Sequence, residues 1–184
     1  MFRFPRPEDI TPAEFEATVK GWFEHFPEKL MSFEAEHLES HVGVDGEFEI
    51  DVTVRFTAFG GAEFLVLCEC KKHKNPIERG LVQILNDKKR SINAHKAIMV
   101  ATAPFQSGAK EYAAKNRIGL IEIVSGKYAY IQNSASPTMP AIPDDADPYC
   151  GLLSFEMPRG AMFPTAVTSD KIYFLAGQRH FVAS

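Results

Sequence analysis

The sequence predicts an α/β protein in which a mixed β-sheet carries helices on its faces, in the order αβββαβαβ, followed by a C-terminal extension. Polar and apolar residues alternate regularly between Glu47 and Phe56, which is typical of a half-buried strand. Two later segments show apolar residues at helical spacing, and short apolar runs bounded by turn residues separate them. Strands that alternate with helices in this way favour a sheet with parallel neighbours.

Composition agrees with one globular domain plus an extension. The chain has 184 residues, of which 45% are hydrophobic and 15 are Phe, which is enough for a sizeable core. No apolar run approaches the roughly 18 residues that span a bilayer. The first residues also lack an apolar stretch of the kind that forms a secretory signal. We therefore expect a cytoplasmic protein, and three cysteines without a disulfide framework agree with reduced thiols.

The first helix is predicted to begin at Thr11-Pro12-Ala13-Glu14, where Thr11 can cap, Pro12 suits the first turn and Glu14 completes a capping box. Apolar residues at helical spacing follow: Phe15, Val19, Trp22, Phe23 and Phe26. Pro27 should end this helix. The segment from Leu30 to Leu38 alternates like a strand, although a short helix is also compatible with it.

The next two strands should form a hairpin. In the segment 47–56 one face should carry Phe48, Ile50, Val52, Val54 and Phe56, and the other face Asp51. Gly60-Gly61 marks a turn, and the segment 64–71 is then almost entirely apolar, so its strand should be central in the sheet.

The second half of the chain alternates helices and strands. Pro76 opens a helix whose buried face holds Leu81, Ile84, Leu85 and Ile92. Strands are expected over 97–101 and 118–123, with an Ala-rich helix over 107–116 between them. Residues 1–133 should form the domain and the Pro-rich segment 134–148 a linker. Residues 149–184 are too few for a core of their own and should dock on the domain or on a partner chain, which would make a homodimer.

Charge is distributed unevenly along the chain. The net charge is −4, yet residues 1–50 hold twelve acids against four Lys/Arg, whereas residues 71–96 hold eight Lys/Arg against two acids. Because phosphate binding depends on the local field, the basic segment is a candidate nucleic-acid contact. Its members besides Lys71 are Lys72, Lys74, Arg79, Lys88, Lys89 and Arg90, together with Lys96. The alternative is a solvated helix face.

The chemistry is predicted to reside at the end of the apolar strand. Glu69 and Lys71 share one face of it about 7 Å apart, and Asp51 lies on the preceding strand of the same hairpin. Burying such charges is costly unless they are paired or bound to a metal. Two carboxylates with a strand carbonyl form an oxygen-rich site suited to Mg²⁺. An E-x-K triplet is common, however, and the strand could instead leave the core at Glu69.

Several ordered motifs resemble a known family. They are Glu14-Phe15-Glu16, Ile50-Asp51-Val52, Cys68-Glu69-Cys70-Lys71-Lys72, Gln83, Ala97-Ile98-Met99-Val100-Ala101-Thr102, Phe105, Ala109, Ala113, and Ile118 with Leu120-Ile121. Across about 110 residues this set is similar to the Mrr-like restriction endonuclease domain of the PD-(D/E)xK nuclease superfamily. The resemblance implies a restriction-endonuclease-like fold and a DNA endonuclease, acting in restriction of foreign DNA.

The resemblance also implies roles for single residues. Asp51, Glu69 and the Cys70 carbonyl would hold Mg²⁺, for which Mn²⁺ can substitute. Lys71 would position or deprotonate the attacking water and stabilise charge on phosphorus. Glu16 would orient a second metal or a water, and Gln83 would contact the scissile phosphate or Lys71.

Some features depart from the family. Glu49 is expected on the face of Asp51, where it could substitute for Asp51 or crowd it. The N-terminal third is acidic, and Gln106 stands where a Ser or Thr cap is commoner. These departures leave open a non-cleaving nucleic-acid- or protein-binding module on a nuclease fold, or an oligomeric scaffold. A zinc site at Cys68, Cys70 and His73 is the weaker metal alternative, because both thiols should lie opposite Glu69 in the core and no second Cys/His pair follows.

Overall fold

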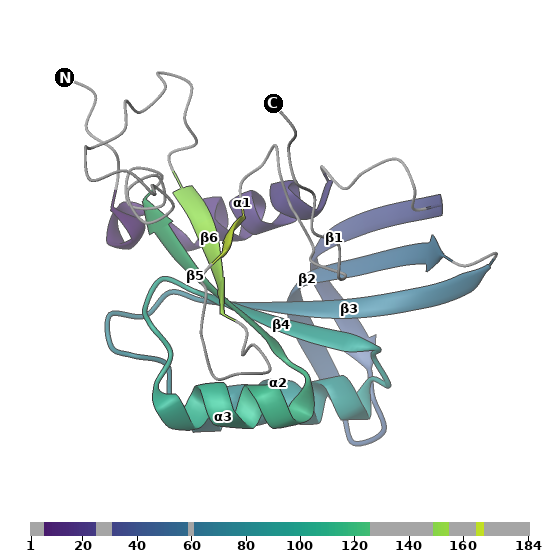
Figure 1. The fold of residues 1–184 in the computed structure, drawn as a ribbon. Coiled ribbons are helices and arrows are strands. Elements are labelled where there is room, and N and C mark those ends of the chain that lie inside the picture. The colour runs from purple at the N-terminus through teal and green to yellow at the C-terminus, as the bar shows by residue number, and fades with distance from the viewer. Residues whose placement is uncertain (1–5, 25–30, 59–60, 126–148, 155–164, 168–184) are drawn as a thin grey trace, which may run out of the picture.

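The computed structural model describes residues 6–24, 31–58, 61–125, 149–154 and 165–167. These residues form three layers, with a seven-stranded sheet in the middle (Figure 1). One helix, α1, lies on one side of the sheet, and α2 and α3 lie on the other. The elements are a short 3-10 helix Pro7–Asp9, α1 Pro12–Glu24, β1 Met31–Val42, β2 Glu47–Ala58, β3 Ala62–Lys71, α2 Arg79–Ser91, β4 Lys96–Ala101, α3 Ser107–Asn116, β5 Gly119–Ser125, β6 Tyr149–Ser154 and β7 Thr165–Val167.

The strands lie in the sheet in the order β1-β2-β3-β4-β5-β6-β7. The hairpin of β2 and β3 is antiparallel, whereas β3, β4 and β5 run parallel. This is the mixed sheet that the sequence predicts, and the predicted order αβββαβαβ is confirmed from α1 to β5. The strand β3 is central, as its apolar sequence indicates, because it pairs with β2 on one side and β4 on the other.

The start of α1 follows the predicted capping box. The backbone N–H of Glu14 donates to Thr11 Oγ1 at 3.2 Å, and the backbone N–H of Thr11 donates to Glu14 Oε2 at 3.0 Å. The helix buries Phe15 and Val19 against the sheet. The predicted stop at Pro27 lies outside the described residues.

The segment around Leu38 is a strand and not a short helix. It forms β1, which pairs antiparallel with β2 from Met31↔Thr57 to Val42↔Glu47. Leu38 has a positive φ of 53°, a conformation that bulky residues rarely adopt, so the strand is irregular at that point. Leu38 faces the position of Asp51 in the register, between the pairs His37↔Val52 and Glu39↔Ile50.

One predicted pattern in β2 is wrong. Val52 and Val54 pack in the cluster on the α1 side, whereas Ile50 packs with Leu67 and Ala94 on the opposite side of the sheet. Phe48 belongs with Ile50, and Phe56 with the α1 side. The alternation of buried and exposed positions along β2 therefore breaks at Asp51, opposite the irregular Leu38 of β1. The apolar residues of β2 thus pack on both sides of the sheet.

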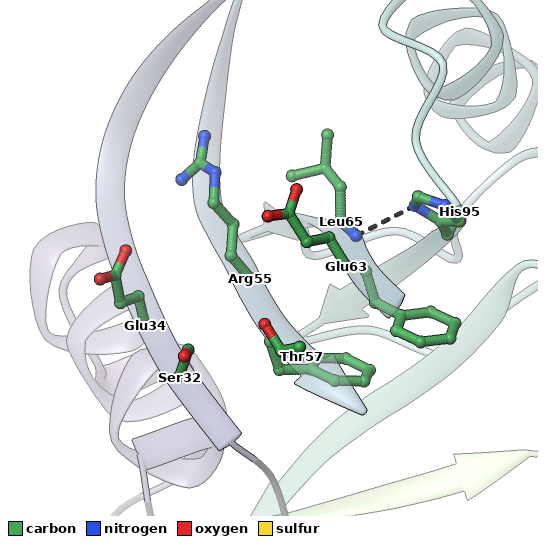
Figure 2. Close-up of a pocket in the computed structure, with 9 residues that line it drawn as sticks. Ser32, Glu34, Arg55, Thr57, Glu63, Leu65 and His95 are labelled. Carbon is green, nitrogen blue, oxygen red and sulfur yellow. Dashed lines mark hydrogen bonds between the residues drawn. The ribbon is translucent and has the colours of Figure 1, made fainter. Parts of the chain in front are cut away.

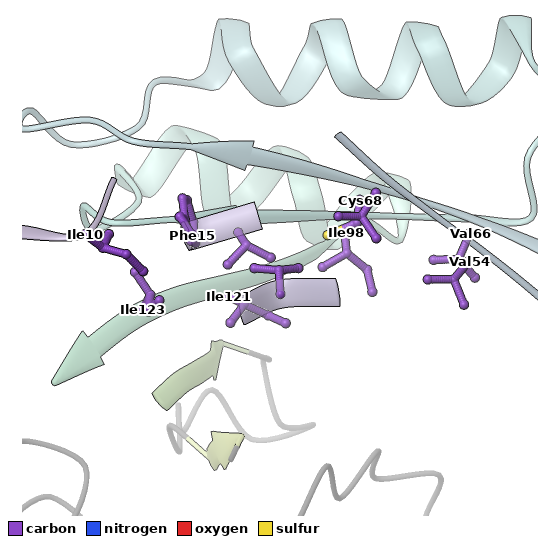
Figure 3. Packing of buried hydrophobic residues seen from close by; sticks show 11 residues of the cluster. Ile10, Phe15, Val54, Val66, Cys68, Ile98, Ile121 and Ile123 are labelled. Atoms are coloured by element: carbon purple, nitrogen blue, oxygen red, sulfur yellow. The ribbon is translucent and has the colours of Figure 1, made fainter. Parts of the chain in front are cut away.

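The core on the α1 side is built by four strands and the N-terminal elements (Figure 3). Its buried members include Ile10, Phe15, Val54, Val66, Cys68, Ile98, Ile121 and Ile123. The second core lies under α2 and α3 and includes Leu85, Met99 and Ala109. The strand β3 is packed on both faces, through Val66 and Cys68 in the α1-side core and through Leu67 against Ile50 and Ala94 on the opposite side. Its polar C-terminal end is therefore held firmly in place.

Beyond β5 the described residues add two strands. β6 pairs antiparallel with β5, and β7 pairs antiparallel with β6. The predicted linker 134–148 lies outside the described residues, as does most of the predicted arm 149–184. None of the described helices combines the length and apolar character that crossing a bilayer requires.

Candidate active site

Glu69 stands at the end of β3 between two ammonium groups. The Lys71 Nζ donates to Glu69 Oε1 at 2.6 Å, and the Lys88 Nζ donates to Glu69 Oε2 at 3.0 Å. Glu69 is only 7% exposed. A buried carboxylate needs such partners, because removing an unpaired charge from water is costly. The structure thus brings together the predicted pair Glu69 and Lys71, and adds Lys88 from α2.

Asp51 lies where β2 and β3 separate. The described ladder between these strands ends at Val52↔Cys68, and one step beyond it Asp51 Oδ2 accepts the backbone N–H of Cys70 at 2.6 Å. Burial raises the pKa of the Asp51 carboxyl, and the charges of Glu69 and Glu16 add to this, against the lowering by the Cys70 hydrogen bond and by Lys71. The side chain of Asp51 is therefore held in place beside Glu69, in a setting that favours a nearby cation.

Glu16 reaches this region from α1. Its Oε2 lies 2.5 Å from His37 Nε2 on β1, and its charge contributes to the raised pKa of Asp51. In the described residues the hydrogen bond of Glu16 is to His37, and not to Asp51 or Glu69. The helix thus brings a third carboxylate near the pair, as a neighbour that acts through its charge.

The loop after β3 carries two predicted phosphate contacts, Lys72 and Lys74, both exposed. Thr102, at the end of β4, fastens this loop: its hydroxyl accepts the backbone N–H of His73 at 3.0 Å and donates to the His73 carbonyl at 3.0 Å. The backbone N–H of Thr102 also donates to the Lys71 carbonyl at 3.1 Å. The two lysines are therefore displayed directly beyond the acidic pair on an anchored loop.

The other basic residues lie at the two ends of α2. Arg79 begins α2 and lies over the Tyr112 ring at 5.2 Å, while Lys89 and Arg90 lie in the last turn of the same helix. A helix of 13 residues separates its two ends by about 20 Å. The sequence placed Lys88 in the DNA-contacting set, yet the structure turns it inward to Glu69.

Gln83 is half-buried on α2. The side-chain hydrogen bonds of Asp51, Glu69 and Lys71 within the described residues go to Cys70, to Lys88 and to one another. None of them reaches Gln83, so the structure does not join this residue to the cluster.

Asp51 and Glu69 fit a hard divalent cation. Both offer carboxylate oxygens, and the Cys70 carbonyl would add a backbone oxygen, which is the donor set that Mg²⁺ and Mn²⁺ prefer. Burial is the main cause of the raised pKa of the Asp51 carboxyl, and the charge of Glu69 adds to it, so a bound cation would favour the charged form of Asp51. No group of three or more Asp, Glu, His or Cys side chains is arranged for a metal among the described residues. The ligand set implied by the family resemblance has two carboxylates and the Cys70 backbone carbonyl.

The cysteines do not fit a zinc site. Cys68 is fully buried in the α1-side core and Cys70 packs against it. A hydrogen bond with Cys68 and burial raise the pKa of the Cys70 thiol well above its usual value, which opposes the thiolate that zinc needs. His73 is exposed in the loop fastened by Thr102.

A cavity of about 350 Å³ lies elsewhere, at the opposite ends of β2 and β3 (Figure 2). It is lined by Ser32, Glu34, Arg55, Phe56, Thr57, Glu63, Phe64, Leu65 and His95. Arg55 already donates two hydrogen bonds to Glu39, at 2.6 and 2.8 Å. This cavity contains none of the predicted catalytic residues.

Sequence reasoning placed Lys88 among the DNA contacts and missed its ion pair with Glu69, and it missed the contacts that Thr102 and His37 make in this region. Lys88 had a recognisable signal, because it follows Leu81 and Leu85 and precedes Ile92 at the spacing of one helical face. A lysine on an apolar stripe must either extend its ammonium to solvent or find a buried partner. Thr102 and His37 had no comparable signal, since their contacts depend on how distant segments pack.

A family model described as "Restriction endonuclease", the Mrr catalytic domain, matches residues 8–126. Two solved structures are similar at 20% identity: a protein of unknown function, AF1548, with a TM-score of 0.46, and EndoMS in its apo form, with a TM-score of 0.37. The matches cover 58% and 60% of this chain, and 55% and 44% of those chains. No curated protein matches.

The family match spans more than half of the chain and includes α1 and the strands β1 to β5. It agrees with the mixed sheet and the flanking helices described above. The chain belongs to the restriction endonuclease family of the Mrr catalytic domain, a family of nucleases.

Proposed function

We propose that this protein is a metal-dependent DNA endonuclease that hydrolyses phosphodiester bonds. The observation that carries the proposal is the convergence of Asp51, Glu69 and Lys71 where β2 and β3 separate. Membership of a nuclease family supports the reaction class. DNA as the substrate, divalent metal dependence and a role in restriction of foreign DNA are parts of the proposal.

Asp51, Glu69 and the Cys70 carbonyl would hold Mg²⁺, with Mn²⁺ as a substitute. When bound, such an ion neutralises phosphate charge and lowers the pKa of an attacking water. The two carboxylates are held in place by the protein itself: Glu69 is fixed by two lysines, and Asp51 by the Cys70 amide. These contacts reduce the reorganisation that binding a cation would require.

Lys71 would act on the reacting groups. Its ammonium is now 2.6 Å from Glu69 Oε1, so it lies on the same carboxylate that would ligate the ion. Released from that contact, the ammonium would orient the attacking water and donate to the phosphate oxygen on which charge develops. We also propose that Glu16 tunes Asp51 through its charge, and that Gln83 contacts the scissile phosphate once DNA is bound.

Lys72 and Lys74 would guide the DNA backbone to this site, because the loop that carries them is fastened next to Lys71. Contacts to phosphate carry no sequence information directly. The protein is therefore expected to cut DNA with low sequence specificity, or to depend on a partner for specificity.

Nicking of supercoiled plasmid tests the proposal. Cleavage is expected with Mg²⁺ or Mn²⁺ and should disappear when the metal is chelated. Linear duplex, single-stranded DNA and RNA of matched sequence should be tested in parallel, and preference for RNA would correct the substrate class. Metal-independent cleavage, or none with any of these substrates, would count against the proposed enzyme.

One observation favours a second function, a non-cleaving nucleic-acid- or protein-binding module. Both oxygens of Glu69 already have an ammonium partner, so the charge of this carboxylate is compensated without a metal ion. A gel shift with DNA under chelating conditions, without any cleavage after metal is restored, would support the module.

We also propose that the arm 149–184 contributes to a homodimer. In the described residues β7 is the last strand of the sheet, and an edge strand can pair with a second chain. Light scattering on the full chain and on a chain ending at residue 148 compares their masses. An unchanged mass per particle would show that the arm does not drive assembly.

A further inference from the structure

The side chain of Lys88 faces the acidic pair and not the solvent. It is 18% exposed, and its Nζ donates to Glu69 Oε2 at 3.0 Å and to the Glu49 carbonyl at 3.3 Å. One ammonium from α2 therefore bridges to β2 and to β3, the two strands that carry the predicted metal ligands. Within the described residues, the ion pairs of Glu69 are with Lys88 and Lys71.

The end of α2 that carries Lys88 is anchored to the turn between β1 and β2. The backbone N–H of Val44 donates to the Ser91 carbonyl at 3.0 Å, and the Ser91 hydroxyl is hydrogen-bonded to Asp45. A Cβ at Gly43 would collide with Ser91 Oγ, so the close approach of turn and helix requires glycine. Lys88 lies one helical turn before this anchor, and its position is therefore fixed.

The two lysines on Glu69 are not equivalent. Lys71 is 25% exposed and has Glu69 as its ion-pair partner, whereas Lys88 is 18% exposed and has the Glu49 carbonyl as a second acceptor. A cation that enters beside Asp51 must take one oxygen of Glu69 from an ammonium. Releasing Lys71 from Glu69 costs less free energy than releasing Lys88, because Lys88 would give up two hydrogen bonds in a less exposed position.

We infer that Lys88 is a positioning residue: it holds Glu69 Oε2 while a metal binds, so that Oε1 is the single oxygen offered to the ion and Lys71 is released. This inference rests on the proposed metal-dependent function. Lys88 also places a permanent positive charge beside the metal ligands, and this charge limits the affinity for a divalent cation. A lysine that contacts DNA from the outer face of α2 would have no such effect.

Mn²⁺ binding to the DNA-free, full-length protein tests the inference, measured by isothermal titration and by the spin-resonance signal of free Mn²⁺. Lys88→Gln removes the charge but keeps an N–H that can donate to Glu69, and Lys88→Met removes both. Each should bind Mn²⁺ more tightly by about tenfold or more, as Coulomb's law gives for a unit charge within a few ångströms of a divalent ion. Lys88→Gln, which can still hold Glu69 Oε2, should bind Mn²⁺ more tightly than Lys88→Met. Lys88→Arg, which keeps the charge, should stay within about twofold of wild type.

Lys89→Met is the matched control, because it removes the same charge from the next position of α2, and salt screens more distant charges. Its Mn²⁺ affinity should change by about twofold at most. Thermal unfolding shows which variants are folded, and if Lys88→Met is not, Lys88→Gln carries the test. Unchanged or weaker Mn²⁺ binding in folded Lys88→Gln would overturn the inference.

The same titration separates this inference from the function on which it rests. If wild type binds no Mn²⁺, both are overturned. If the variants show the expected affinities for Mn²⁺ but wild type cuts no nucleic acid, the role of Lys88 is supported and the proposed nuclease activity is overturned.

Discussion

The carboxylate of Asp51 accepts the backbone N–H of Cys70 at 2.6 Å, one residue beyond the last described pair between β2 and β3. An N–H that would otherwise continue the ladder is satisfied by a side chain. This contact allows the two strands to separate without leaving a buried donor unpaired. It also places Asp51 next to the strand that carries Glu69 and Lys71.

Asp51→Asn should stabilise the metal-free protein at neutral pH. Burial raises the pKa of Asp51 in the folded state, so folding favours its protonated form. The associated stability is present below the unfolded pKa and is lost as pH rises through the folded one. Asparagine removes the charge and still accepts the Cys70 N–H. At pH 7 the melting temperature should rise by a few degrees, and the gain should shrink in acid.

Differential scanning calorimetry from pH 3 to pH 8 measures this effect, with exposed Asp87→Asn as the control. Saturating Mg²⁺ should remove or reverse the difference, because only wild type would gain stability from binding. A variant that melts below wild type at pH 7 without metal would contradict the assignment of Asp51 as a destabilised metal ligand.

Glu16→Gln should shift the acid limb of the pH–activity profile to lower pH. Burial is the main cause of the raised pKa of Asp51, and the charges of Glu69 and Glu16 add to it, so removing one of these charges lowers that pKa. Cleavage and metal binding should then begin at a lower pH, while the plateau rate stays the same. Loss of activity at every pH would instead show that Glu16 acts directly in the chemistry.

The control for this variant is Glu36→Gln, which removes an exposed carboxylate from β1. Its acid limb should coincide with that of wild type. A common shift in both variants would point to the general charge of the N-terminal third and not to Glu16.

Thr102→Val should weaken DNA binding more than it slows cleavage. The Thr102 hydroxyl makes two hydrogen bonds to the His73 backbone, and valine has the same shape without them. Their loss should cost about 1–3 kcal/mol of unfolding free energy. The loop with Lys72 and Lys74 would then hold phosphate less firmly, so KM for DNA should rise while kcat changes little.

Thr102→Ser keeps the hydroxyl and should restore the affinity for DNA. Fluorescence anisotropy with a labelled duplex measures it under chelating conditions. Equal affinity of wild type and Thr102→Val would show that the loop does not contact DNA.

Local signals in the sequence predicted most of the fold. The capping box at Thr11, the apolar strand before Glu69 and the helical stripe of α2 each depend on residues close together in the chain. In the stripe of α2 the prediction is wrong for Ile84, which is 56% exposed. Such patterns determine which elements form and which face is buried. The alternation in β2 failed at Ile50, because the irregular β1 at Leu38 and the end of the ladder to β3 are tertiary features.

The candidate site was predicted only as far as neighbouring strands could define it. A hairpin pairs nearby segments, so Asp51, Glu69 and Lys71 could be placed together from the sequence. Lys88 lies 19 residues from Glu69, on a helix whose position is set by the β1–β2 turn. Basic residues of the same sequence segment therefore have different environments: Lys72 faces solvent, whereas Lys88 pairs with a buried acid.

Single-turnover nicking of supercoiled plasmid by Lys71→Met and Asp51→Asn, with Mg²⁺, tests the central claim most directly. Lys115→Met and Asp87→Asn, which change exposed residues outside the site, serve as controls. The account predicts that both site variants lose about 100-fold or more in rate while the controls match wild type. Nicking at the wild-type rate by either folded site variant would contradict it.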